Sequence, residues 1–203
     1  MLDHVFTDAI AALRDAFESA LLERQPFEEH FQSDVISGDL TWETSYGLPG
    51  EGDPPHVVAH ITFDWPAWSQ AAYRQWYVDD ELDARPAIEI EIVLRVQQLA
   101  EPVDAEVVFA AMPERGPSLG GEQLERAGLT TEVAHPDRHL DPLALTSEYA
   151  VEITYEGLYE LAEEAIVDGT STVLDDDFGA LGGWIAATLV KLGDLDMTFL
   201  AAD

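Results

Sequence analysis

The segment Ala87–Leu99 constrains the fold most, because apolar and polar side chains alternate along its whole length. In an extended chain, Ile88 and Ile90 fall on one side, and Glu89 and Glu91 fall on the other. This period of two predicts a long β-strand with one buried face and one face in water. A sheet that contains such a strand is typically antiparallel and covered by helices on one side only.

The rest of the chain alternates between strand-like and helix-like patterns, which predicts an α+β fold. Residues 103–110 also alternate, so we expect them to form a hairpin with Ala87–Leu99 through the short connection at 100–102. Strand-like patterns cover 35–46, 56–64, 129–134, 149–155 and 195–200, and helical spacing covers 3–24, 65–82, 158–167 and 178–192. The predicted architecture is a mostly antiparallel sheet with helices packed on one face.

The length of 203 residues predicts a single globular domain. Residues 113–121 are rich in proline and glycine, and they form the best linker in the chain, between the segments 1–112 and 122–203. Short motifs recur on its two sides: 40–43 (LTWE) resembles 129–132 (LTTE), and 61–64 (ITFD) resembles 153–156 (ITYE). Either the two segments are related strand-strand-helix halves, or the similarity is the chance likeness of amphipathic strands.

The chain carries 41 acidic residues and only 9 lysine or arginine residues, a formal net charge of −32. Nucleic acids and anionic membrane surfaces bind clustered basic residues, and here the basic residues are scattered singly. We therefore expect neither nucleic acid nor a membrane as a partner. Acidic runs such as 79–81 and 175–177 repel most strongly at low salt, so we expect the protein to lose stability when salt is removed.

The use of cysteine and lysine is also unusual. Cysteine is absent, so no disulfide, thiol nucleophile or zinc–thiolate cluster can form, and Lys191 is the only lysine. In these features the composition of the whole chain resembles that of cytosolic proteins from salt-in halophilic archaea. The resemblance implies a soluble, cytoplasmic, archaeal protein that folds in concentrated salt, and it points to no specific family.

Aromatic side chains gather in the predicted helix at 65–82. They are Trp65, Trp68, Tyr73, Trp76 and Tyr77. Packing against the sheet core is one interpretation of this helical face. A ligand-binding platform or a subunit interface is the other, because tryptophan and tyrosine give a large contact area at low entropic cost.

One loop of the chain brings together several side chains that bind metals. Two imidazoles and two carboxylates lie close together in the sequence: His135, Asp137, His139 and Asp141. The prolines among them exclude a continuous helix, and a loop can fold such ligands around Zn²⁺ or another divalent ion. Water activated by that metal would support hydrolysis. Since no second cluster of ligands accompanies them in the sequence, our first expectation is that the protein has no cofactor.

Two other motifs carry less weight. His56 and His60 are too far apart along one strand to share a metal ion, so we expect them to pack across strands, where one imidazole could titrate near neutral pH. Residues 116–120 match the G-x-S-x-G pattern of hydrolase nucleophile elbows. The sequence around them does not predict the strand and the long helix that flank such an elbow.

Together these patterns favour a non-enzymatic interaction or ligand-binding domain over an enzyme. The expected partner is a second copy of the chain or another protein, and a small molecule held between the aromatic helix and the sheet is a further option. The alternative function is a metal-dependent hydrolase with the loop at 135–141 as its metal site.

Overall fold

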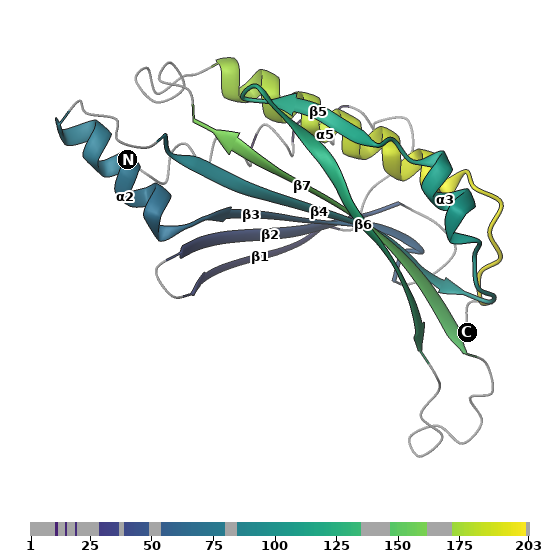
Figure 1. Ribbon diagram of the computed structural model, residues 1–203. Coiled ribbons are helices and arrows are strands. Elements are labelled where there is room, and N and C mark those ends of the chain that lie inside the picture. The colour runs from purple at the N-terminus through teal and green to yellow at the C-terminus, as the bar shows by residue number, and fades with distance from the viewer. Residues whose placement is uncertain are drawn as a thin grey trace.

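The computed structural model describes residues 29–36, 39–48, 54–79, 85–134, 147–161 and 172–201, with the single positions 11, 15 and 19. These residues build one antiparallel sheet of seven strands in the order β1-β2-β3-β4-β7-β6-β5 (Figure 1). The strands are β1 (Glu29–Ile36), β2 (Asp39–Gly47), β3 (Val57–Trp65), β4 (Ala87–Leu99), β5 (Arg115–Leu119), β6 (Glu122–Ala134) and β7 (Glu148–Glu160). The helices are α2 (Ala67–Asp79), α3 (Ala105–Ala111) and α5 (Thr172–Gly193). The predicted α+β class with an antiparallel sheet is confirmed.

The predicted strand Ala87–Leu99 is confirmed as β4, in the middle of the sheet. β3 pairs with one side of it and β7 with the other, so that Ile92 has Ile61 and Tyr155 as direct neighbours. Ile92 is fully buried whereas Glu91 is exposed. This alternation is what a sheet covered on one face requires.

Helix α5 covers the concave side of the curled sheet (Figure 1). Its buried side chains recur every three or four residues and form one stripe: Leu174, Phe178, Leu181, Ile185, Leu189 and Leu192. The ring of Phe178 meets Phe63 and Tyr159 edge-on, at centroid distances of 5.4 and 5.0 Å. The apolar stripe predicted at 178–192 is therefore the helix face that closes the core.

A buried hydrogen-bond network fixes the start of α2 against β4. The indole Nε1 of Trp65 donates to the Ser69 hydroxyl at 2.8 Å, and this hydroxyl donates to the Ala87 carbonyl at 2.6 Å. The Ala87 N–H donates back to the Ser69 oxygen at 2.7 Å. Pro66 separates β3 from α2, and because proline suits the first turn of a helix, the chain passes from strand to helix at this point.

Residues 103–110 do not form the predicted strand, so the predicted hairpin with β4 is wrong. They fold largely as α3, whose N-cap residue Asp104 accepts a hydrogen bond from the Glu106 N–H at 3.0 Å. Val108 is buried whereas Val107 and Phe109 are exposed, although a strand at this place was expected to turn Val103, Ala105, Val107 and Phe109 toward the core. The alternation is too short to distinguish a strand from a helix, and the N-cap with the proline before it favours the helix.

Part of the predicted linker at 113–121 is itself a strand of the sheet. This strand, β5, pairs with β6 through a tight turn in which Gly120 and Gly121 have φ values of +57° and +95°. Residues with a Cβ atom rarely adopt such angles, so glycine suits both turn positions. The glycines thus connect two neighbouring strands.

The two segments that share sequence motifs have the same order of elements but different strand registers. Among the described elements, the first segment holds β2, β3 and α2 in this order, and the second holds β6, β7 and α5. Leu40 lies opposite Trp65, whereas Leu129, at the matching motif position, lies opposite Ile153. A duplication of the strand-strand-helix unit therefore stays a prediction.

Other predicted elements differ from the structure or fall outside it. β7 continues to Glu160, so the helix predicted at 158–167 does not begin there. The closing strand predicted at 195–200 is reduced to a single bridge with the end of β4. The helix predicted at 3–24 lies outside the described residues, apart from three single positions. In the part of the chain that the structure describes, no helix is both long and apolar enough to cross a membrane.

Candidate functional site

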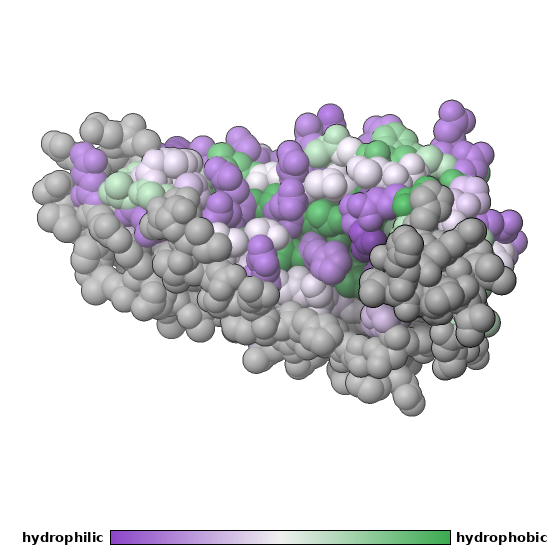
Figure 2. Space-filling model, turned by 90° about the horizontal axis from the view of Figure 1, so that it is seen from below, coloured by the Kyte–Doolittle hydropathy of each residue, from purple (hydrophilic) through white to green (hydrophobic). Residues whose placement is uncertain are grey.

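Among the described residues, the face of the sheet opposite α5 is open, and Figure 2 shows hydrophilic side chains around a smaller apolar area on this side. Directly paired residues of neighbouring strands point to the same face. Glu91 of β4 lies opposite Thr62 of β3 on one side and Glu156 of β7 on the other. Glu156 in turn lies opposite Glu125 of β6. A row of three carboxylates from three neighbouring strands therefore crosses the open face.

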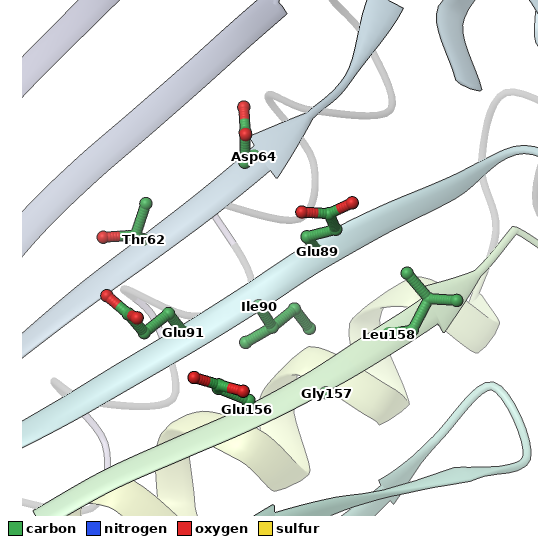
Figure 3. Close-up of a pocket in the computed structure, with 8 residues that line it drawn as sticks. All are labelled: Thr62, Asp64, Glu89, Ile90, Glu91, Glu156, Gly157 and Leu158. Atoms are coloured by element: carbon green, nitrogen blue, oxygen red, sulfur yellow. The ribbon is translucent and has the colours of Figure 1, made fainter. Parts of the chain in front are cut away.

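This carboxylate row borders a depression of about 680 Å³. The depression is lined by Thr62, Asp64, Glu89, Ile90, Glu91, Glu156, Gly157 and Leu158 (Figure 3). Side chains that are directly opposite on neighbouring strands lie about 4.5–5.5 Å apart at Cβ, so the like charges repel each other. The depression therefore favours cationic groups over anionic ones. Among the described residues, no group of three or more His, Asp or Glu side chains is arranged to hold a metal ion.

A second polar group lies beside the depression on the same face. The Ser45 hydroxyl on β2 lies 2.7 Å from Nδ1 of His60 on β3. Nearby, Arg95 of β4 forms ion pairs with Glu152 of β7 and, at 3.0 Å, with Glu132 of β6. Arg95 thus offsets one of the two negative charges of Glu152 and Glu132, and in the carboxylate row Glu125 lies 3.9 Å from Arg115.

The pair of Ser45 and His60 does not have the surroundings of a catalytic nucleophile. Ser45 has His30 and His60 as neighbours in the sheet, and His60 has Ser45 and Val93. In the interior of a sheet, backbone N–H groups are used by the neighbouring strands, so none is presented to stabilise an oxyanion. The contact is a hydrogen bond across two strands.

We expect the pKa of His60 to lie below the usual histidine value of 6.5, and to rise when Arg95 is replaced by glutamine. Partial desolvation on the sheet surface is the main cause of the lowered pKa, and the charge of Arg95 is the second, whereas Glu152 and Glu43 oppose both. The Arg95→Gln change removes one cause and leaves a nearby carboxylate unpaired, so both effects raise the pKa.

The same shift sets the sign of a pH effect on folding. Because the pKa of His60 is higher in the unfolded chain than in the folded protein, protonation of His60 favours the unfolded state. The protein therefore loses stability as the pH falls below 6.5. An NMR titration of the His60 imidazole in the natural protein and in Arg95→Gln measures the two pKa values. A pKa for His60 that is unchanged or lower in Arg95→Gln would contradict the prediction.

The predicted aromatic cluster divides into a buried part and an exposed part. Trp65 and Tyr73 are 0% and 4% exposed and meet edge-on at 5.6 Å, so they belong to the core. Trp68 is 50% exposed. The side chains of Trp76 and Tyr77 lie outside the described residues. The structure therefore brings Trp65 and Tyr73 together and leaves Trp68 as the exposed candidate.

The predicted metal ligands His135, Asp137, His139 and Asp141 all lie outside the described residues. The divalent-ion site and the hydrolase that depends on it stay predictions, which metal analysis of the full chain tests. The G-x-S-x-G match is settled differently, because Ser118 lies within β5 and the tight turn to β6 follows directly. A strand-to-strand turn at this place is not a nucleophile elbow, which needs a helix after the serine.

Further exposed apolar side chains, which the sequence patterns did not indicate, lie on α3 and near the end of β6, two places that are apart in Figure 1. Val107 and Phe109 on α3 are 57% and 38% exposed, and Val133 on β6 is 49% exposed. The guanidinium of Arg126 stacks on the Phe109 ring, 3.3 Å from its centroid, and donates to the Phe109 carbonyl at 2.7 Å. Treating 105–111 as a helix would have shown that adjacent apolar residues there cannot all face the core.

Comparison with protein families, curated proteins and solved structures finds no match to this chain. Its function is therefore inferred from two exposed surfaces. One is the open sheet face with its carboxylate row. The other consists of the exposed apolar side chains Val107 and Phe109 on α3 and Val133 on β6.

Proposed function

We propose that this protein is a non-enzymatic interaction domain that associates with a second copy of itself. The observation that carries the proposal is the apolar group, by which we mean the exposed side chains Val107 and Phe109 on α3 and Val133 near the end of β6. Single exposed apolar residues are common on monomeric proteins, whereas larger exposed apolar areas are typical of protein–protein contacts. Among the described residues, three of the four large exposed hydrophobic side chains belong to this group.

The charge of the protein also bears on the choice of partner. A cationic partner would be attracted to the carboxylate row, whereas the apolar group offers contact area with little charge. A second copy carries the same apolar group, so a two-fold contact buries the group on both copies at once. Repulsion between two chains of net charge −32 opposes the contact, and salt screens this repulsion.

We also propose that the protein works in the cytoplasm of a halophilic archaeon. The ratio of 41 acidic to 9 basic residues and the single lysine support this setting, as does the absence of cysteine. At about 1 M salt, charges are screened beyond about 3 Å. Association between copies would therefore be strongest in the salt that this composition suits.

Sedimentation velocity of the full chain at about 0.1 M and about 3 M KCl tests the proposal. At high salt we expect a dimer with twice the 22.3-kDa mass of the chain, and at low salt we expect weaker association. Val133→Ser should weaken the dimer because it removes apolar contact area. Ala71→Ser, which also alters an exposed apolar side chain but on α2, is the matched control and should leave association unchanged. A monomer at both salt concentrations would contradict the proposal.

A further inference from the structure

About half of β6 has a neighbouring strand on one side only. On its outer side it pairs with β5, and the last pair joins Arg115 to Glu125. On its inner side the pairing with β7 continues to the end of β6. From 128 to 134, β7 is thus the only strand beside β6 in the part of the chain that the structure describes. We call the outer side of residues 128–134 the free edge.

The free edge begins where the chain before β5 turns away toward α3. The Tyr155 hydroxyl donates to the Pro113 carbonyl at 2.7 Å, and the Arg126 N–H donates to the Glu114 carbonyl at 3.1 Å. β6 also has a register shift between Arg126 and Gly128, at the point where pairing with β5 ends. These contacts hold the preceding chain at the start of the free edge and keep it from covering the rest.

The free edge has few of the features that protect strand edges from pairing with another chain. Proteins usually protect such edges with proline, lysine, unpaired charge or a bulge. Residues 128–134 (GLTTEVA) contain neither proline nor lysine, and their one carboxylate, on Glu132, is paired with Arg95 at 3.0 Å. Residues 130–134 are all exposed. In a chain with 41 acidic residues, this is a stretch that another copy can approach against little local repulsion.

We infer that the free edge pairs antiparallel with the free edge of a second copy, so that one sheet runs through both chains. The inference rests on the proposed self-association and places the contact along the free edge, which includes Val133 of the apolar group. Residues that lie directly opposite each other in a continuous sheet point to the same face. The two-fold axis must therefore pass between one residue and the same residue of the second copy. With Thr131 on the axis, residues 128–134 pair over their whole length, and Leu129 lies opposite the partner's Val133.

The side chains of the free edge favour this register over its neighbours. Leu129, Thr131 and Val133 lie on the α5 side of the sheet, because they pair with core-facing residues of β7. On that face, Leu129 of each copy therefore lies opposite Val133 of the other copy, so an apolar pair forms at each end of the paired segment. An axis at Glu132 would set two carboxylates directly opposite each other, and an axis at Thr130 would extend the pairing into the bulge.

Cysteine cross-linking tests this register, because the natural chain contains no cysteine. In Thr131→Cys the two thiols stand on directly opposite residues, whose Cα atoms are about 4.5–5.5 Å apart, within the range for a disulfide. Ser118→Cys is the matched control, since Ser118 is also exposed on a strand of the same edge but lies outside the free edge. At high salt and under mild oxidation, we expect Thr131→Cys to form a covalent dimer about tenfold faster or more than Ser118→Cys.

Sedimentation of the unchanged chain separates the two ways in which the inference can fail. If the chain is a dimer but Thr131→Cys cross-links no faster than Ser118→Cys, the free edge is not the interface, while self-association still holds. If the chain is a monomer, the proposed function and the inference are both wrong. Circular dichroism of the reduced Thr131→Cys protein verifies its folding, which we expect to be unchanged because Thr131 is exposed.

Discussion

Replacing Trp65 with alanine is expected to lower the free energy of unfolding by about 3–5 kcal/mol. Trp65 is 0% exposed, and its ring meets Tyr73 edge-on at a centroid distance of 5.6 Å. The change would leave a large cavity and also remove the indole donor to Ser69, whose hydroxyl connects α2 to Ala87 of β4. Denaturant unfolding at high KCl measures the loss.

Trp68→Ala is the matched control for this experiment, because the same residue type is removed three positions further along the chain. Trp68 is 50% exposed, so its replacement should cost less than about 1 kcal/mol. Equal losses in the two variants would show that Trp68 is as deeply packed as Trp65. Sedimentation of Trp68→Ala separates the alternatives for the exposed ring, since a change in association without a change in stability would make it an interface residue.

The difference between these two tryptophans shows why the aromatic segment was only partly predictable. Helical spacing places Trp65, Trp68 and Trp76 on one face, and the prediction assumed one helix through all of them. The structure ends β3 at Trp65 and starts α2 after Pro66. Trp65 therefore takes its orientation from the strand, and the helical phase that would align it with Trp68 does not apply.

Two of the correctly predicted elements have a long, single periodicity. Ala87–Leu99 alternates over its whole length, and the stripe at 178–192 repeats with helical spacing, so each pattern fits one type of structure only. Residues 103–110 span too few periods, and the side-chain bond from Asp104 to the Glu106 N–H favours the helix α3.

The sequence predicts which side chains of β4 face solvent, but not which residues of neighbouring strands lie beside them. Alternation in β4 places Glu89 and Glu91 toward solvent, as the structure confirms. Which residues face them across the sheet depends on β7, whose ion pair with Arg95 joins residues 57 positions apart in the chain. No local pattern fixes such a pairing or its register, because both follow from how the strands assemble in three dimensions. For the same reason, the free edge of β6 follows from the shorter length of β5.

Removal of salt is expected to destabilise the whole protein. Opposite like charges in a sheet cost about 0.2–1 kcal/mol each, and the carboxylate row holds two such contacts, Glu91 with Glu156 and Glu156 with Glu125. The chain as a whole carries a net charge of −32. Since each kcal/mol shifts Tm by about 2–4 °C at this size, several such repulsions should lower Tm by about 5–10 °C between multimolar and low KCl. A Tm that does not change with KCl would contradict the prediction.

Two matched variants on β7 separate the local repulsion from a general effect of salt. Glu156→Gln removes the central carboxylate of the row, so at low salt it should stabilise the fold by about 0.2–1 kcal/mol. Glu152→Gln makes the same chemical change four residues earlier on the same face, but it removes an ion-pair partner of Arg95 and should therefore destabilise the fold. At about 1 M KCl the screening distance falls to about 3 Å, and the gain from Glu156→Gln should largely disappear. If both variants shift stability in the same direction at low salt, the row does not contribute repulsion beyond that of the net charge.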